Sequence, residues 1–403
     1  ISKRLEGAFE NVAKNRGAPG PDGQEIEQVR KRLGELVPRL RTELLDGTYE
    51  PGEIRRVYIP KAGGQRGLGI PNVVDRMVQE AVRQVLEPVY EPTFHESSHG
   101  FRPNRSCHTA IREAQSYIEQ GLEVVVDLDV EKFFDGVNHQ RLMARLAQRV
   151  TDKRVLVLVG KMLKAGVVMP DGVVVSTEEG VPQGSPLSPL LSNVVLSELD
   201  EELDRRGHRF VRYADDCNIY VRSVRAGQRV MASVAEFLGR RMRLKVNEAK
   251  SAVARTEERH FVGFRLERDP EEGEVEILLS ARSEKRLKQK VKDRGLWACH
   301  LDPELGGQGF GQVKLALMHE ILGRVSTAPN VFGNQAPDSG NSELIAIGGT
   351  DEQKERWLHP LLRGEITSSF SLTEPHFSGS DPTMIATRAE RDGDEYVLNG
   401  TKT

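Results

Sequence analysis

The chain has 403 residues, of which 38% are hydrophobic and 29% charged, and its formal net charge is -3 at pH 7. This composition is typical of a globular protein of two or three domains, and no apolar run approaches the roughly 20 residues that a membrane-spanning helix needs. The three cysteines share no close spacing and the first residues lack a signal-peptide pattern, which excludes a disulfide framework or zinc cluster and predicts a cytoplasmic protein with free thiols.

The charge is unevenly divided along the chain. Residues 1–290 contain 47 Lys and Arg against 44 Asp and Glu, whereas residues 291–403 contain 10 against 16. The two parts therefore differ in kind, although the small positive surplus of the first part does not by itself indicate a nucleic-acid partner.

The first ninety residues predict two helices on either side of a strand and a loop. Residues 17–23, GAPGPDG, form a glycine- and proline-rich turn. From Gln24 to Leu45 apolar residues recur on one face, which predicts an amphipathic helix that packs on a core. Another helical pattern begins at residue 72 and is expected to end near Pro88.

Between these helices, residues 54–71 read IRRVYIPKAGGQRGLGIP. They predict a strand that ends in Lys61, followed by a glycine-rich turn that carries Arg66. Such a loop can bring cations and backbone N–H groups onto a triphosphate, where arginine makes a fork and lysine acts as a point charge. A plain charged hairpin explains this segment, taken alone, equally well.

Residues 95–99 read HESSH and match the HExxH pattern of zinc proteases letter for letter. That pattern holds a metal only within a long helix, where both histidines share one face. Because Gly100 and Pro103 follow at once, no such helix is expected, and a metalloprotease is rejected. The nearby Arg102 and Arg105 are instead predicted to meet phosphate.

A helix is predicted over residues 109–119, and the apolar residues 124–126 then predict a buried strand. Asp127 and Asp129 follow that strand and point to the same face because they are two residues apart. Carboxylates at the end of a buried strand need a cation or an opening to solvent. Asp127 fits a structural partner or a helix cap equally well, so the residues leave the choice between the two acids open.

Residues 155–163 continue a helix, residues 167–176 predict a hairpin, and residues 180–193 read GVPQGSPLSPLLSN. Gly184 has no side chain, so the backbone there can approach a ligand closely, and the prolines stiffen the path into the next helix. A simple loop before a packed helix is the alternative. The rigid chemistry of the segment suits a surface that touches a base pair.

Residues 210–221, FVRYADDCNIYV, predict two strands joined by a tight turn with Asp215 and Asp216 at its tip. Adjacent carboxylates repel each other unless a divalent cation neutralises them, and Mg²⁺ suits such oxygen ligands. An ordinary solvated turn is the alternative. A helix is expected over residues 230–241, and Lys250 then follows in LKVNEAKS, either as a solvated side chain or as a proton donor to a leaving pyrophosphate.

Taken in order, these segments resemble the reverse transcriptases encoded by bacterial group II introns, over about residues 1–290. The motifs are GAPGPDG, IPKAGGQRGLGIP, SHGFRPNRS, VVDLDVEKFFD, GVPQGSPLSPLLSN, RYADD, LKVNEAKS and FVGF. Several motifs in one order are far more specific than any one of them. The resemblance implies an α+β right-hand polymerase, with fingers and the start of the palm in residues 1–120, the palm with its YADD hairpin in residues 121–280, and a truncated thumb helix in residues 281–294.

The resemblance also implies an RNA-directed DNA polymerase that adds dNTPs to a primer 3′-OH on an RNA template such as intron RNA. It selects Asp129 over Asp127, so that two Mg²⁺ ions would be held by Asp129, Asp215 and Asp216. Lys250 would serve as the general acid.

Further contacts are implied around the incoming nucleotide. Lys61 and Arg66 would bind its triphosphate, and the ring of Phe134 would occupy the place of a ribonucleotide 2′-OH. Gln183 and Gly184 would contact the nascent base pair. Residues 261–264 would support the primer end.

Beyond residue 294 the resemblance changes. GLWACHLDPELGGQGFGQVKLALMHEILGR and the strings that follow, through RDGDEYVLNGTKT, resemble the N-terminal part of an acyl-CoA dehydrogenase. Residues 295–366 would form a helical fragment and residues 367–403 the start of the middle β-domain. The junction of the two resemblances is expected near residues 290–295, and the fragment is expected to expose apolar helix faces.

In that second family, the segment that matches Phe370, Ser371, Leu372 and Thr373 lies against the flavin, and Ser380 lies near the flavin or the thioester. The resemblance does not reach the C-terminal helical bundle, which supplies the catalytic base and most of the flavin site. FAD is therefore not expected to be retained.

Two other functions compete with polymerisation. One is a non-catalytic RNA-binding remnant that uses the basic fingers, with an affinity that falls steeply as salt rises. The absence of a complete thumb, which normally clamps the duplex, favours it. The other is an FAD- or acyl-CoA-binding fragment without a complete active site.

Overall fold

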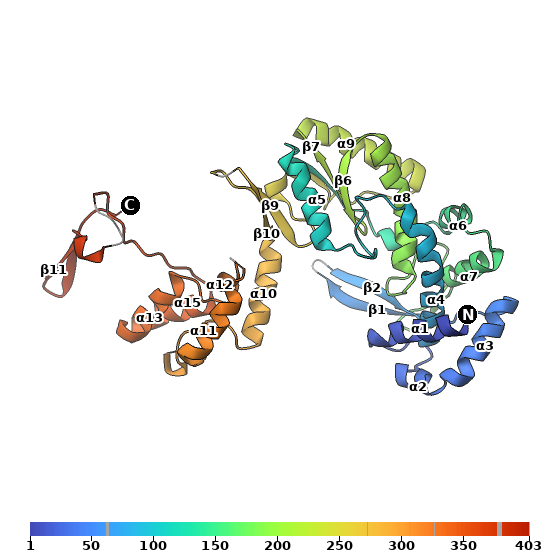
Figure 1. Cartoon of the computed structure of the whole chain (residues 1–403), viewed down its shortest axis with the longest axis horizontal. Helices are drawn as coiled ribbons and strands as arrows, with labels where there is room; N and C mark the ends of the chain where they lie inside the picture. Colours follow the sequence, from blue (N-terminus) through green and yellow to red (C-terminus); the bar gives the residue numbers. More distant parts are fainter. Residues whose placement is uncertain (62–63, 272, 306, 326, 377–380, 403) are drawn as a thin grey trace. The chain divides into compact units, whose positions relative to one another are not determined.

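The computed structural model describes residues 1–61, 64–271, 273–305, 307–325, 327–376 and 381–402, with the side chains of Lys61 and Pro382 left out (Figure 1). It divides the chain into two compact units, Ile1–Leu278 and Leu279–Thr403. Each unit has a hydrophobic core of its own. The mixture of helices and strands confirms the coarse α+β prediction.

The first unit contains helices that surround two sheets. They are α1 (Ser2–Lys14), α2 (Ile26–Lys31), α3 (Leu33–Asp46), α4 (Val73–Tyr90), α5 (Cys107–Glu119), α6 (His139–Ala147), α7 (Lys153–Leu163), α8 (Ser188–Arg205) and α9 (Val224–Phe237). A π-helical segment, Leu238–Met242, extends α9.

One expected helix is interrupted in the structure, and another ends two residues later than the proline at which its end was expected. The single helix predicted from Gln24 to Leu45 is two helices, because the backbone at Arg32 leaves helical geometry, with φ -106° and ψ 5°. The helix predicted to end near Pro88 continues to Tyr90. Pro88 removes one N–H within the last turn, while burial of Tyr90 and its hydrogen bond to the Leu146 carbonyl, at 2.9 Å, hold that turn in place.

Two sheets of the first unit have four strands each. One has the order β2–β1–β4–β5, with β1 (Ile54–Lys61), β2 (Gly64–Ile70), β4 (Val167–Val168) and β5 (Val174–Val175). The other has the order β6–β7–β3–β8, with β3 (Val124–Leu128), β6 (Arg209–Tyr213), β7 (Asp216–Val221) and β8 (Ala252–Arg255). A separate pair joins β9 (Phe264–Arg268) to β10 (Val275–Leu279). The predicted hairpins over residues 167–176 and 210–221 are both present.

The two faces of the β6–β7–β3–β8 sheet pack against different helices. Val124, Val126 and Leu128 alternate toward the larger core, to which α8 and α9 contribute. Val125 points to the opposite face, where it packs in a smaller core with residues of α5. Because side chains alternate along a strand, the even and odd positions of β3 are buried by different elements.

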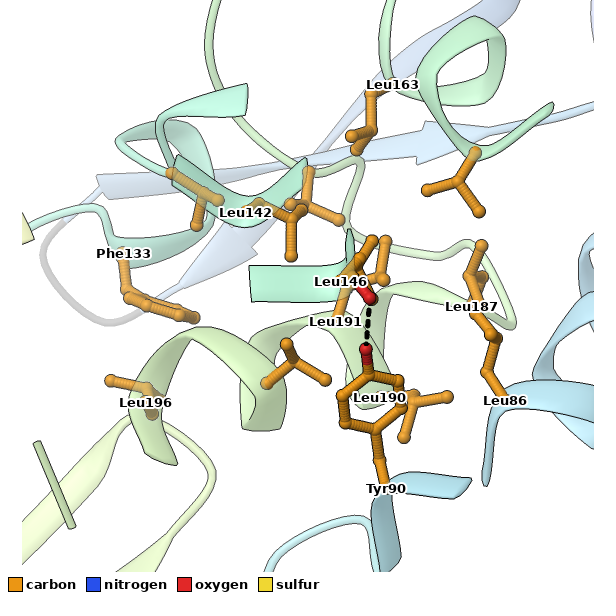
Figure 2. Close-up of a cluster of buried hydrophobic side chains, with 14 of the residues drawn as sticks. Leu86, Tyr90, Phe133, Leu142, Leu146, Leu163, Leu187, Leu190, Leu191 and Leu196 are labelled. Carbon is orange, nitrogen blue, oxygen red and sulfur yellow. Dashed lines mark hydrogen bonds between the residues drawn. The ribbon is translucent and has the colours of Figure 1, made fainter. Parts of the chain in front are cut away.

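Leucines from α4, α6, α7 and α8 meet in the larger core, as Figure 2 shows. Leu86, Leu142, Leu146 and Leu191 are each at most 2% exposed. Truncation of one such side chain to alanine costs about 2–5 kcal/mol. The core thereby fixes α8, which follows the GVPQGSPLSPLLSN loop, against the rest of the unit.

The second unit is mostly helical. It contains α10 (Ala281–Asp293), α11 (Gly311–Leu322), α12 (Ala328–Val331), α13 (Asp338–Gly348), α14 (Asp351–Gln353), the π-helical segment Lys354–Leu358, α15 (His359–Arg363) and the hairpin of β11 (Arg388–Asp392) and β12 (Glu395–Asn399). The hairpin strands are exposed along their whole length.

Helix α10, which the sequence predicts as the start of a thumb, folds as part of the second unit. Lys292 places its ammonium group 4.7 Å from the centroid of the Trp297 ring. The indole N–H of Trp297 donates to the Leu362 carbonyl at 2.6 Å. The structural division thus precedes α10, whereas the two sequence resemblances meet after it.

Helix α11 exposes apolar side chains on one side, as expected for a fragment of a larger fold. Val313 is 77% exposed, Leu317 59% and Ile321 64%. These positions are four residues apart and lie one above the other on the helix. Among the helices that the structure describes, none has the length and apolar character needed to cross a membrane.

Candidate functional site

The β6–β7 hairpin presents two adjacent acids at its tip. Its register pairs Tyr213 with Asp216, so Ala214 and Asp215 form the turn. The φ angle of Ala214 is 57°, in the left-handed region, which costs an L-residue with a side chain roughly 1–2 kcal/mol. The predicted strand, turn and strand are confirmed, and the strained turn must be held by its surroundings.

Strand β3 brings Asp129 to the same end of the sheet. In the β3–β7 register Asp127 pairs with Asn218 and Leu128 with Cys217. Continuation of that register by one residue puts Asp129 opposite Asp216. Because alternate residues share a face, Asp129 and Asp216 lie on the face opposite Leu128 and Cys217. The backbone therefore brings the two acids to neighbouring positions, with Asp215 in the adjoining turn.

The LKVNEAKS segment fixes Asp129 from the other side. The backbone N–H of Asp129 donates to the Ser251 hydroxyl at 3.0 Å, and the N–H of Asn247 donates to the Asp129 carbonyl at 2.8 Å. The Lys250 ammonium group lies 3.7 Å from a carboxylate oxygen of Asp129. The sequence interpretation missed Asn247 and Ser251, although both lie in the motif that contains Lys250.

Asp127 has a different partner. Its carboxylate accepts hydrogen bonds from Arg259 at 2.9 Å and 2.5 Å, and the same guanidinium donates to the Lys250 carbonyl at 2.9 Å. Of the two interpretations that the sequence leaves open, a structural partner is therefore the one that describes Asp127.

The acids suit a hard divalent cation in their chemistry, because carboxylate oxygens from adjacent backbone positions are the ligands that Mg²⁺ prefers. Among the described residues, no group of three Asp, Glu, His or Cys side chains is close enough together to hold a metal ion. Asp129 is turned toward Lys250 instead. Mg²⁺ binding by Asp129, Asp215 and Asp216 stays a prediction.

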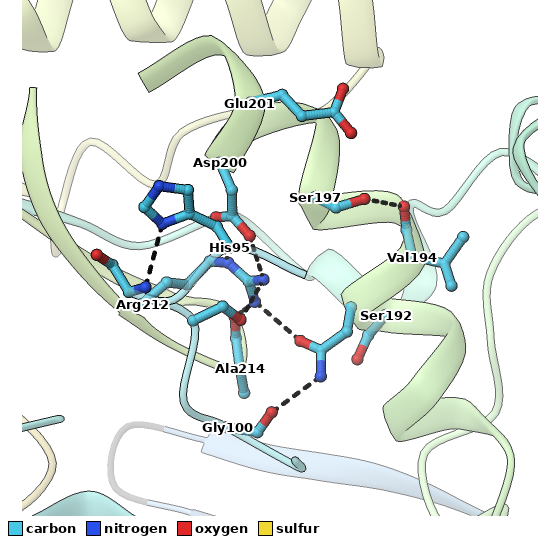
Figure 3. A network of polar contacts seen from close by, with 12 residues as sticks. His95, Gly100, Ser192, Val194, Ser197, Asp200, Glu201, Arg212 and Ala214 are labelled. Carbon is cyan, nitrogen blue, oxygen red and sulfur yellow. Dashed lines mark hydrogen bonds and ion pairs between the residues drawn. The ribbon is translucent and has the colours of Figure 1, made fainter. Parts of the chain in front are cut away.

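A buried arginine lies directly behind the hairpin tip, as Figure 3 shows. Arg212 has no exposed surface and forms an ion pair with Asp200 of α8 at 2.6 Å. Burial acts to lower the pKa of the Arg212 guanidinium, and the negative charge of Asp200 more than offsets it, so that the pKa is raised above its ordinary value. The sequence interpretation missed this residue, whose only signal is a charged side chain at an inward position of a strand.

The loop with Gln183 and Gly184 is joined to strand β2. The N–H of Gly69 donates to the Gln183 carbonyl at 2.7 Å. Gly184 has a φ of 119°, and a Cβ added there would lie 2.6 Å from the Gly69 carbonyl oxygen. Two segments for which the sequence predicts nucleotide contacts are thereby in direct contact. Arg66 lies on the same strand, opposite Ile59 of β1.

Lys61 ends β1 as predicted, but its side chain lies outside the described residues. Phe134 is half-buried against the larger core, next to the buried Phe133, with 5.3 Å between the ring centroids. The Phe134 carbonyl accepts from the N–H of Val181 at 2.6 Å, so the segment after Asp129 touches the start of the loop that contains Gln183.

The HESSH segment carries no zinc-protease helix. It lies between a short 3₁₀ turn at residues 91–93 and α5. The His99 ring is hydrogen-bonded to Thr109 at 2.8 Å and to Glu113 at 2.6 Å. The expected phosphate contact of Arg102 is wrong, because this side chain is only 5% exposed and is taken up by Glu91 and by backbone carbonyls.

The predicted primer-supporting residues 261–264 form a tight turn that leads into β9. The N–H of Phe261 donates to the Phe264 carbonyl at 2.8 Å, and the reverse bond is 2.9 Å. Both Val262 and Gly263 have positive φ angles in this turn. In the second unit, residues 370–373 have no regular structure and Phe370 is 65% exposed, while Ser380 lies outside the described residues.

Comparison with known proteins gives two family matches. The reverse transcriptase (RNA-dependent DNA polymerase) family matches residues 59–266, which is more than half of the chain. The N-terminal domain of acyl-CoA dehydrogenases matches residues 246–365.

Individual relatives match one part of the chain or the other. Protein YkfC of Escherichia coli is 41% identical over 199 residues, which are 48% of this chain and 52% of that protein. Group II intron-encoded protein LtrA of Lactococcus lactis is 38% identical over 203 residues, 48% of this chain and 32% of that protein. Acyl-CoA dehydrogenase family member 11 of Mus musculus is 47% identical over 117 residues, 29% of this chain and 15% of that protein.

The chain thus spans about half the length of YkfC and less of the other two relatives. The two kinds of match confirm that two unrelated sequences are joined in one chain. The chain belongs to the reverse transcriptase (RNA-dependent DNA polymerase) family, and its C-terminal part is similar to the N-terminal domain of acyl-CoA dehydrogenases.

Proposed function

We propose that the first unit is an RNA-directed DNA polymerase that adds dNTPs to a primer 3′-OH on an RNA template such as intron RNA. The observation that supports this most directly is the backbone arrangement at one end of the β6–β7–β3–β8 sheet. Asp129 directly follows the last residue of β3, Asp216 begins the neighbouring strand β7, and Asp215 lies in the turn before it. This sheet is the proposed palm.

In this function Asp129, Asp215 and Asp216 hold two Mg²⁺ ions, which when bound activate the attacking oxygen and neutralise the leaving one. The chain contributes position and charge, as is general for phosphoryl transfer. Asn247 and Ser251 hold the backbone of Asp129 in place. Lys250, already beside Asp129, donates a proton to the leaving pyrophosphate.

Strand β2 and the loop before α8, which are joined by a hydrogen bond, form the proposed pocket for the incoming nucleotide. Gln183 and Gly184 contact the nascent base pair, and their attachment to Gly69 fixes them relative to β2. Arg66 and Lys61 bind the triphosphate. Phe134 excludes a ribose 2′-OH.

The remaining architecture follows from this assignment. Sheet β2–β1–β4–β5 with α1 to α4 corresponds to the fingers, and α10 to the start of a thumb. No flavin chemistry is proposed for the second unit, in which Phe370 of the expected flavin segment is exposed.

A second candidate function is RNA binding without catalysis. Among the described residues, the buried Nε atoms of Arg55, Arg56 and Arg76 have no hydrogen-bond partner. Arg55 and Arg56 are nevertheless partly exposed on β1, and their guanidinium groups could bind phosphate oxygens of an RNA. Binding of this kind would lose affinity steeply as salt concentration rises.

Primer extension decides between these functions. The full chain should extend a DNA primer on an RNA template in the presence of Mg²⁺, and Asp215→Asn or Asp216→Asn should lower extension at least ~100-fold without unfolding the chain. Asp46→Asn, at an exposed position at the end of α3, is the matched control and should extend normally.

Near-normal extension by Asp215→Asn or Asp216→Asn would overturn the two-metal assignment. Salt-dependent binding of the RNA template without any extension would replace the polymerase by the RNA-binding function.

A further inference from the structure

Among the residues that the structure describes, Arg212 is the largest fully buried side chain, and it lies on the strand that leads into the acidic turn. It points to the face of β6 opposite Tyr213 because adjacent residues of a strand alternate. A buried guanidinium is tolerated only where its charge and its donors are all matched. The hydrogen-bond partners of Arg212 therefore indicate which part of the structure this residue holds in place.

Each of its five N–H donors has an acceptor. Nε and one Nη2 donor bind the two Asp200 carboxylate oxygens at 2.7 Å and 2.6 Å. The other Nη2 donor binds the Ser98 hydroxyl at 2.7 Å. The Nη1 donors bind the Asn193 side-chain oxygen at 3.0 Å and the Ala214 carbonyl at 2.7 Å. Only the planar fork of arginine can serve these acceptors together.

Two of these partners, Ala214 and Asn193, hold the turn itself. The Ala214 carbonyl belongs to the strained residue that directly precedes Asp215. On its other side, Gly100 packs so closely that an added Cβ would lie 2.2 Å from the Ala214 nitrogen. The side-chain NH2 of Asn193 donates to the Gly100 carbonyl at 2.9 Å, and the side-chain oxygen of Asn193 accepts from Arg212. Asn193 thus ties both sides of the turn to α8.

We propose that Arg212 is a positioning residue for the acidic turn. It holds the Ala214 carbonyl so that Asp215 and Asp216 keep their places beside Asp129, and it links that placement to helix α8. The acids require such a support because mutual repulsion and the left-handed Ala214 both favour rearrangement of the turn. The proposal deepens the polymerase function proposed above and rests on it for its catalytic meaning.

An ion pair that served stability alone would behave differently. Replacement of a buried ion pair by apolar residues of similar size is often neutral or stabilising. The double variant Arg212→Met with Asp200→Leu removes both charges together, so the core stays free of an unpaired charge. The double variant also removes the hydrogen bond from Arg212 to the Ala214 carbonyl. A loss of turn order without a loss of stability would therefore indicate a positioning role.

The matched control is the double variant Arg141→Met with Glu198→Leu. Arg141 binds both carboxylate oxygens of Glu198 at 2.8 Å, also on α8, but Arg141 lies on α6 and not on the hairpin that carries the turn. Both double variants are compared with the wild type in three measurements. These are the melting temperature, the hydrogen exchange of the peptide over residues 213–218, and the binding of Mn²⁺ measured by electron paramagnetic resonance. Steady-state kinetics give kcat and the KM for dNTP.

The Arg212→Met and Asp200→Leu variant should stay folded, exchange the turn amides at least ~10-fold faster and bind Mn²⁺ at least ~10-fold more weakly. Its kcat should fall at least ~10-fold with KM for dNTP little changed, because the interaction lost acts on the reacting centre and not on substrate binding. The control should match the wild type in all four measurements. Wild-type exchange and Mn²⁺ affinity in the Arg212 variant would overturn the positioning role.

If the double variant does not fold, the single variant Arg212→Lys tests the positioning role with the same measurements. Lysine keeps the charge beside Asp200 but is a point charge that cannot serve the Asp200, Asn193 and Ala214 acceptors together. If the wild type neither binds Mn²⁺ nor extends a primer, the polymerase function fails. The exchange comparison over residues 213–218 still decides whether Arg212 holds the turn.

Discussion

The backbone N–H of Gly69 donates a hydrogen bond of 2.7 Å to the carbonyl of Gln183, and the Gly69 carbonyl lies directly against Gly184. This contact joins two glycine-containing segments that are far apart in the sequence. It leaves no room for a side chain at Gly184, whichever residue replaces it.

Gly184→Ala should lower the free energy of unfolding by about 1–3 kcal/mol more than Gly172→Ala. Both glycines have positive φ angles, 119° and 86°, so both variants acquire backbone strain. A Cβ added at Gly184 would meet the backbone of Gly69 within 4 Å, whereas a Cβ added at Gly172 would meet no atom within that distance. Urea unfolding of the two variants measures the difference, and equal losses would mean that the contact with β2 is not needed.

Asp127 and Asp129 should respond in opposite ways to the same change. Asp127→Asn should cost about 1.5–3 kcal/mol of stability, because it weakens the charged hydrogen bonds from Arg259, and should leave most extension intact. Asp129→Asn should change stability little, since its pair with Lys250 is partly exposed, and should lower extension at least ~100-fold.

Thermal melting and Mg²⁺-dependent primer extension, done on both variants side by side, separate the two roles. A reversed pattern, with extension lost in Asp127→Asn alone, would show that the ligand is assigned to the wrong acid.

The adjacent rings of Phe133 and Phe134 provide another matched pair. Phe133→Ala should cost about 3–5 kcal/mol, because this ring is 2% exposed in the larger core. Phe134→Ala should cost less and should raise incorporation of ribonucleotides relative to deoxynucleotides by about 10–200-fold, if its ring excludes the 2′-OH. Single-nucleotide incorporation with rNTP and dNTP gives that ratio. An unchanged ratio would remove Phe134 from the nucleotide pocket.

Glu374 organises the start of the β-segment in the second unit. The Thr387 hydroxyl, the Ala386 N–H and the Lys402 ammonium group bind its carboxylate and lower its pKa to about 2, from an ordinary value of 4.5. A carboxylate with a lowered pKa contributes stability that is full above pH 4.5 and is lost as the pH falls through about 2.

The amide signals of Ala386 and Thr387 in NMR spectra should therefore keep their folded positions as the pH is lowered through 4.5 and move only as it approaches 2. Glu374→Gln should shift them already at neutral pH. A midpoint near 4.5 in the wild type would show that these hydrogen bonds do not form.

The local sequence pattern predicted the hairpin of β6 and β7. Alternating apolar residues on both sides of two adjacent acids are compatible with few structures other than two strands joined by a turn. The sequence pattern also predicted that Asp127 and Asp129 share a face. The choice between them depends on Arg259, which is 132 residues from Asp127, and no local pattern contains that information. Resemblance to a family supplied the choice.

The network of Arg212 could not be predicted for the same reason. Its acceptors come from Ser98, Asn193, Asp200 and Ala214, of which only Ala214 is a neighbour in sequence. Arginines are usually exposed, so a pattern-based interpretation assigned Arg102 to a phosphate although it is buried by Glu91. Tertiary partners, and not residue type, decide which arginines are structural.

The place of α10 has a practical consequence for dividing the protein. A truncation after residue 294, where the two sequence resemblances meet, would separate Lys292 from Trp297 and uncover Val291, which is 4% exposed. Helix α10 would then remain attached to the first unit without the residues of the second unit that contact it. A truncation at the end of β10 follows the boundary between the units, and it yields the shorter polypeptide that is better suited to expression and assay.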